Sequence, residues 1–238
     1  MKRLMMTAAF LAAASVVWSI DLEFGGGAFL GASWSKSETE TFVVSPASSS
    51  MPVDIKGTFE YNTNSFDAGG FLFAGINYAE LSVGYLGQFG KVTDIKMSME
   101  MPGVPSQAQD DEDYTSHLFV VDLLGKYPFA IGEKISLFPA LGVGLKLTLA
   151  GHDYDNEVSW GLNLKGGGGV DVALTERLFF RGEALFVFQV ASDREATLKD
   201  DNLPHKPDVT FAATGYYMGP LVKLAVGYKI PLGAKDEE

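Results

Sequence analysis

Residues 178–190 read LFFRGEALFVFQV and residues 216–230 read YYMGPLVKLAVGYKI, and both stretches alternate between two kinds of side chain. In the second stretch the even-numbered positions are mostly large and apolar, whereas the odd-numbered positions carry mainly glycine, alanine and lysine. Successive side chains of a β-strand point to opposite faces, so a period of two indicates a strand. Long strands with one apolar face and one charged or glycine-rich face are typical of a transmembrane barrel with a polar lumen.

The first residues predict export from the cell. Lys2 and Arg3 precede an apolar run over residues 4–17, and Val17-Trp18-Ser19 ends this run with residues suited to a cleavage site. We therefore predict a secretory signal peptide over residues 1–19, a barrel over residues 20–230 and a short polar periplasmic tail over residues 231–238. An N-terminal membrane anchor is the less favoured alternative, because the run is short for a helical span of about 20 residues.

The composition excludes several function classes. The chain has no cysteine, so it can form neither a disulfide nor a thiolate nucleophile nor a cysteine metal site. A formal net charge of -12 argues against nucleic acid as a partner, since nucleic-acid binding requires a basic surface. We expect no cofactor and no bound metal.

Six further segments show the same alternation. Together with the two quoted stretches they predict eight strands, over residues 22–34, 66–76, 79–89, 118–127, 135–149, 162–174, 178–190 and 216–230. The connections between these segments alternate between long and short, the long ones covering about residues 35–65, 91–116 and 192–213. Short periplasmic turns and longer external loops are the rule in outer-membrane barrels.

We therefore predict an all-β fold, an eight-stranded antiparallel up-and-down transmembrane β-barrel with both ends of the barrel on the periplasmic side. The alternative is a soluble lipocalin-like binding barrel, in which the apolar face would point inward and the charged face outward.

The chain resembles the small eight-stranded outer-membrane barrels of the OmpA, OmpX and OmpW type. The resemblance is carried by Tyr127-Pro128-Phe129, by LFPALG over residues 137–142, by LTERL over residues 174–178 leading into Arg181-Gly182-Glu183, and by the closing strand. It implies a location in the bacterial outer membrane, contact with outer-membrane lipids, and recognition of the C-terminal strand by the barrel-assembly machinery. Ile230 stands where such families usually have phenylalanine.

Charged residues of both signs share the inward parity of the predicted strands. They are Glu23, Glu80, Asp122, Lys126, Lys146, Lys165, Asp171, Arg181, Glu183, Lys223 and Lys229. Charges inside a narrow barrel must be paired or hydrated, and eight strands enclose a space that side chains just fill. We predict a salt-bridge network that largely plugs the lumen. The alternative is a narrow porin-like channel for ions or small solutes, with Lys165, Arg181 and Glu183 in its lining; an apolar conduit is disfavoured because the inward parity is not apolar.

Other polar motifs do not indicate catalysis or ligand binding. The glycine run at residues 166–169 lies within a strand, without the lysine and helix of a phosphate-binding loop, so we expect it to let the wall bend or a bulky lumen side chain pack there. The acidic run at residues 110–113 is interpreted as a solvated loop. Ser116 and His117 face opposite ways along a strand and form no dyad, so we predict that the protein is not an enzyme.

The long connections are rich in Ser, Asn, Asp and Thr. Loops of this kind often carry recognition, so a structural or surface-interaction role is expected, with a host or surface ligand bound by residues 35–65 and 91–116.

Overall fold

The computed structural model describes residues 21–39, 42–45, 57–99, 107–108, 111–149, 158–193, 195–199, 208–212 and 214–232. The predicted signal peptide and most of the predicted tail lie outside these residues. In the described part of the chain, no helix is long and apolar enough to cross a membrane.

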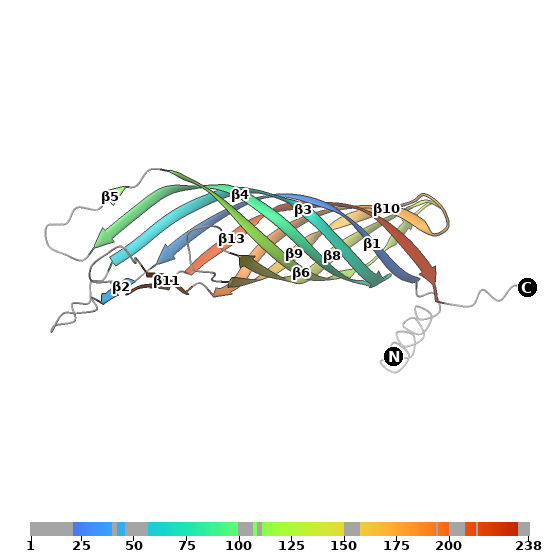
Figure 1. The fold of residues 1–238 in the computed structure, drawn as a ribbon. Coiled ribbons are helices and arrows are strands. Elements are labelled where there is room, and N and C mark those ends of the chain that lie inside the picture. The colour runs from blue at the N-terminus through green and yellow to red at the C-terminus, as the bar shows by residue number, and fades with distance from the viewer. Residues whose placement is uncertain are drawn as a thin grey trace, which may run out of the picture.

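Eight long strands make up the barrel. They are β1 (Asp21–Thr39), β3 (Gly57–Ile76), β4 (Ala79–Met99), β6 (Glu112–Lys126), β8 (Ile135–Leu149), β9 (Val158–Ala173), β10 (Leu178–Asp193) and β13 (Thr214–Pro231). Each strand pairs antiparallel with its neighbours along the chain, and β1 closes the ring by pairing with β13. Figure 1 shows these strands tilted around a common axis. The predicted fold class is confirmed.

Five short strands complete the structure. They are β2 (Phe42–Ser45), β5 (Gln107–Ala108), β7 (Phe129–Ile131), β11 (Glu195–Lys199) and β12 (Asp208–Ala212). β5 and β7 extend the barrel sheet beside β4 and β8, whereas β11, β12 and β2 form a separate sheet at the end of the barrel opposite the short turns (Figure 1). Gly132 turns the chain between β7 and β8 with a φ of 77°, a conformation that glycine adopts without strain.

The strands are longer at the loop end than the alternation predicted. Residues 35–39, 57–65, 91–99 and 112–116 were predicted as loop but belong to β1, β3, β4 and β6. They continue the ladder of the barrel, as in the pairs Thr39 with Phe59 and Gly57 with Met99. The prediction stopped early because polar residues occupy both parities there, which removes the apolar alternation without removing the hydrogen bonds between strands.

The outer surface of the barrel is an apolar band between two aromatic girdles. The lower girdle, at the short-turn end, consists of Phe24, Tyr78, Tyr127, Phe129 and Tyr228; the upper girdle consists of Trp34, Phe66, Phe89, Trp160 and Tyr216. On β1 the girdles are ten residues apart, which gives about 25 Å at ~3.3 Å per residue and a tilt of ~35–45°.

This band matches the hydrocarbon layer that an outer-membrane barrel spans. Exposed side chains between the girdles include Leu30, Leu72, Val83 and Leu141, whereas those just above the upper girdle include Asn64, Lys91 and Asp113. The charged parity points inward, so the lipocalin-like alternative is wrong. The protein is an integral outer-membrane β-barrel.

Candidate functional site

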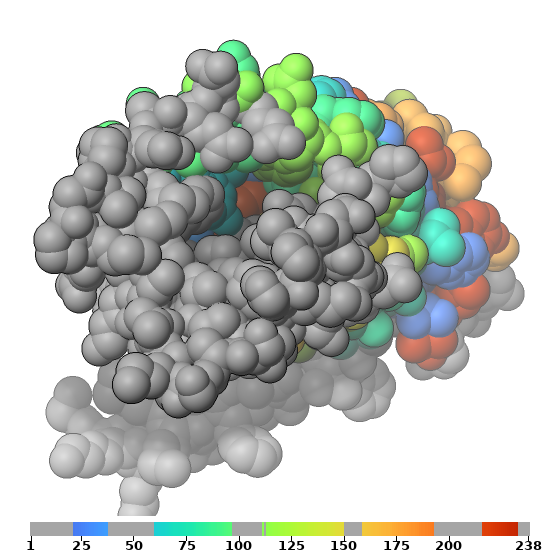
Figure 2. Space-filling model, turned by 60° about the vertical axis from the view of Figure 1, so that its left-hand side comes forward, coloured from blue at the N-terminus to red at the C-terminus, as the bar shows by residue number. Residues whose placement is uncertain are grey.

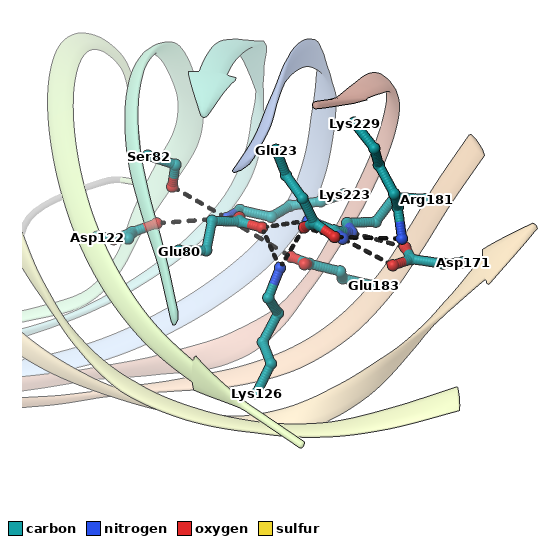
Figure 3. Close-up of polar contacts among 10 residues, drawn as sticks. All are labelled: Glu23, Glu80, Ser82, Asp122, Lys126, Asp171, Arg181, Glu183, Lys223 and Lys229. Atoms are coloured by element: carbon teal, nitrogen blue, oxygen red, sulfur yellow. Dashed lines mark hydrogen bonds and ion pairs between the residues drawn. The ribbon is translucent and has the colours of Figure 1, made fainter. Parts of the chain in front are cut away.

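The lower half of the barrel interior contains a cluster of charges around Arg181 on β10. Arg181 donates two hydrogen bonds to the Asp171 carboxylate at 2.7 Å each, one to Glu80 Oε2 at 2.5 Å and one to Glu23 Oε2 at 2.8 Å. Lys126 donates to Glu23 at 3.2 Å and to Glu80 at 3.1 Å. Figure 3 shows these side chains converging inside the barrel. We call Glu23, Glu80, Lys126, Asp171 and Arg181 the Arg181 cluster.

Aromatic rings surround the Arg181 guanidinium and restrict access of water to it. Its central carbon lies 4.8 Å from the ring centre of Phe179, 5.1 Å from that of Phe73 and 5.4 Å from that of Phe138. Arg181 is only 2% exposed. Because paired charges attract more strongly away from water, this packing strengthens the ion pairs as well as filling space.

A second group of charges lies deeper in the membrane, around Lys223 on β13. Lys223 Nζ donates to Ser82 at 3.2 Å and lies 3.6 Å from Glu183, 3.7 Å from Asp122 and 3.9 Å from Glu80. We call Ser82, Asp122, Lys165, Glu183 and Lys223 the Lys223 group. Lys165 Nζ approaches Asp122 Oδ1 to 2.6 Å, and Figure 3 shows Lys223 among the three carboxylates. Neither carboxylate oxygen of Glu183 has a hydrogen-bond partner among the described residues.

The two remaining predicted residues lie at opposite ends of the interior. Lys229 is at the short-turn end, where its Nζ lies 3.3 Å from Glu23 Oε1 and its side chain is partly exposed. Lys146 is nearer the loop end, with its Nζ 3.8 Å from the ring centre of Tyr217. The structure thus places all eleven predicted residues on the inner face, nine of them in the Arg181 cluster or the Lys223 group.

Asp67 is a buried acid that the sequence prediction missed. It accepts hydrogen bonds from Tyr217 at 2.8 Å and from Gln88 at 3.0 Å. It lies at the edge of a predicted strand and shares the parity of Phe71 and Phe73, which obscured the pattern there. Together with Asp67, the eleven predicted residues comprise six acidic and six basic side chains on the inner face. Their formal charges therefore cancel.

The interior is also more apolar than the sequence prediction stated. Phe29, Phe71, Leu86 and Leu118 form one buried cluster, and Leu124, Phe138 and Leu185 belong to a second. These residues share the inward parity with the charges, so apolar and ion-paired side chains lie together on the inner face. Simple alternation separates the inner face from the outer face but does not show this mixture.

Inward glycines make room for the large interior rings. A Cβ atom added to Gly169 would overlap the ring of Phe138, which agrees with the packing role expected for residues 166–169. A Cβ atom on Gly84 would lie 2.7 Å from the Phe29 ring. Phe138 and Phe29 therefore each depend on an inward glycine of another strand, because the bore of an eight-stranded barrel is narrow.

Replacing Gly84 by leucine is expected to destabilise the barrel by about 1–3 kcal/mol, because the new side chain overpacks the interior against Phe29. The matched control is Gly70→Leu, since Gly70 faces lipid and an added Cβ would meet only ordinary contact at 3.6 Å. Urea unfolding in lipid vesicles measures the free energy of unfolding of both variants. Equal effects of the two substitutions would show that the interior is not tightly packed.

The other predicted polar features lie on the surface. In the acidic run, Asp111 forms an ion pair with Lys91 at 2.9 Å above the upper girdle, and this contact raises the pKa of Lys91. His117 faces outward, where its Nδ1 lies 2.6 Å from the hydroxyl of Tyr85, whereas Ser116 faces inward. No group of three or more potential metal ligands occurs in the part of the chain that the structure describes.

No family model matches the sequence, and no curated protein matches it. Among solved structures, the outer membrane protein OprG from Pseudomonas aeruginosa is similar with 14% identity and a TM-score of 0.48, over 90% of this chain and 96% of that chain. The outer membrane protease OmpT from Escherichia coli has 7% identity and a TM-score of 0.43, over 89% and 97%. Neisserial surface protein A has 12% identity and a TM-score of 0.35, over 84% and 98%.

Proposed function

We propose that this protein is an outer-membrane surface barrel with a closed lumen, and that its role is structural or lies in surface interaction rather than in bulk transport. The observation that carries the proposal is the Arg181 cluster. Its five side chains come from five of the eight barrel strands, β1, β4, β6, β9 and β10, and each is at most 8% exposed. Burial of five ion-paired side chains from five strands at one level of the bore supports a lumen that is closed to solutes at that level.

Purified barrel inserted into planar lipid bilayers is expected to give no steady single-channel current, because the charged side chains fill the lumen. The measurement is conductance at high salt, with a known porin as the positive control. Large and steady unitary currents from the unmodified protein would contradict the closed lumen.

A narrow channel for ions or small solutes is the second candidate, and the Lys223 group favours it. Lys223 Nζ is 3.6 Å or more from each of its three carboxylates, and Glu183 accepts no hydrogen bond from the described residues. Distances of this length between charged groups are suited to bridging water molecules, and a row of such water molecules would give ions a path through the barrel. Small currents that change in selectivity in a Lys223→Gln variant would support the channel, and unchanged silence would contradict it.

Surface interaction is assigned to the loop end of the barrel, above all residues 35–65 and 91–116, whose polar composition suits recognition. The ends of these ranges belong to β1, β3, β4 and β6, so the connections proper are residues 40–56 and 100–111. Shortening each of these two connections and comparing barrel assembly with binding to host cells tests this role, and binding that survives both deletions would contradict it. Recognition of β13 by the barrel-assembly machinery and the absence of enzymatic activity stay predictions.

A further inference from the structure

An open groove of about 520 Å³ crosses the outer wall of the barrel at the level of the upper girdle. Its outward side chains form two rows, and each row takes one residue from β3, one from β4 and one from β6. They are Asn64, Lys91 and Asp113 in the row farther from the membrane, and Phe66, Phe89 and Thr115 in the row nearer to it. We call these six residues the rim groove. Figure 2 shows atoms with the colours of β4 and β6 next to each other on the outer surface at the loop end.

The rim groove lies where lipid headgroups meet the barrel. Phe66 and Phe89 belong to the upper girdle, and both rings are exposed. Aromatic girdles mark the level of the headgroups in outer-membrane barrels. Toward the membrane, β3 and β4 continue outward with the exposed side chains of Leu72 and Val83. A lipid whose headgroup occupies the groove can therefore keep its acyl chains against the apolar band.

The ring of Phe89 forms the membrane side of the rim groove. A Cβ atom added to Gly87, the next outward residue of β4 toward the membrane, would lie 3.0 Å from this ring. The ring therefore leans over Gly87, toward the membrane, and leaves room between itself and Lys91. Aromatic rings attract cations, so this side of the groove suits a ligand with an ammonium group.

The polar row of the rim groove carries a base and an acid on neighbouring strands. Lys91 and Asp113 are directly opposite each other in the pairing of β4 with β6, and paired strands lie ~4.8 Å apart. Lys91 also forms an ion pair with Asp111 at 2.9 Å, in which the two side chains are 51% and 48% exposed. Ion pairs as exposed as this one are weak, so another anionic group can compete for Lys91.

We propose that the rim groove binds the phosphoethanolamine headgroup of a phospholipid. The phosphate accepts hydrogen bonds from Lys91 and Asn64, and the ammonium donates to Asp113 beside the Phe89 ring. Only an oxygen and two carbon atoms separate the two charged groups of this headgroup, so it can contact side chains of neighbouring strands. A headgroup with a negative charge alone fits less well, because the two acids Asp111 and Asp113 lie near the single base Lys91.

Native mass spectrometry of the full barrel tests the proposal, after its release from nanodiscs with equal amounts of phosphatidylethanolamine and phosphatidylglycerol of identical acyl chains. We expect the barrel to retain phosphatidylethanolamine about threefold or more over phosphatidylglycerol. Asp113→Asn should abolish this preference, because the ammonium loses its partner, whereas Lys91→Gln should weaken retention of both lipids. The matched control is Glu133→Gln/Lys134→Gln, which removes one acid and one base from an exposed short turn; it should leave the preference unchanged.

Three results would overturn the proposal. They are equal or greater retention of phosphatidylglycerol by the unmodified barrel, an unchanged preference in Asp113→Asn, and an equal loss of preference in the short-turn control. The altered side chains are exposed, so every variant should fold, and the change in gel mobility on boiling verifies this. The rim groove lies on the outer wall and does not depend on the closed lumen. A barrel that conducts and still prefers phosphatidylethanolamine would refute the closed lumen alone.

Discussion

Replacing Arg181 by methionine is expected to lower the free energy of unfolding by about 3–5 kcal/mol, the cost of breaking a buried ion pair by removing one partner. The substitution removes both hydrogen bonds to Asp171 and one each to Glu23 and Glu80. Glu23 and Glu80 keep Lys126, so the main loss falls on Asp171. Urea unfolding in lipid vesicles, followed by tryptophan fluorescence, measures the change.

Two further variants separate charge from packing. Arg177→Met is the control, because Arg177 is an exposed residue of a short turn whose bond goes to Tyr228; no measurable change is expected. In Arg181→Met/Asp171→Asn the unpaired carboxylate is gone, so part of the stability should return. If Arg181→Met costs less than about 1 kcal/mol, the cluster is hydrated and does not act as a dry plug.

Replacing Lys223 by methionine is expected to cost a similar amount, about 3–5 kcal/mol. Lys223 is 1% exposed and lies between three carboxylates, those of Glu80, Asp122 and Glu183. Without its ammonium group these acids repel one another in a medium of low dielectric constant. The same unfolding measurement applies, with Lys91→Met as the control, because Lys91 is exposed and forms its ion pair above the membrane.

Glu183 provides the test of this explanation. Its oxygens accept no hydrogen bond from the described residues, so Glu183→Gln removes a charge without breaking a bond. In the Lys223→Met background it should restore about 1 kcal/mol or more, since it relieves repulsion. A further loss of stability in the double variant would mean that Glu183 is held by contacts other than Lys223.

The barrel could be predicted from the sequence because its determinants are local. A period of two fixes which side chains share a face, and the alternation of short and long connections fixes antiparallel pairing between neighbours. The segment at residues 135–149 shows this well, since its predicted bounds coincide with those of β8. For the same reason, all eleven charged residues could be placed on the inner face before the structure was known.

The tertiary structure decided which of those residues meet. Glu23 and Arg181 are 158 positions apart, and their contact depends on the stagger of all the strands around the closed ring, which no single strand encodes. The same holds for the packing of Phe29 over Gly84 and for the bond from Tyr217 to Asp67. The sequence also did not predict that β3 and β4 extend beyond the membrane. Hydrogen bonds between neighbouring strands continue the sheet there, although the apolar alternation has ended. The strand to which a side chain belongs determines whether it points into the barrel or out of it. Its position along the barrel axis and the residues that it contacts depend on how all the strands are staggered in the closed barrel.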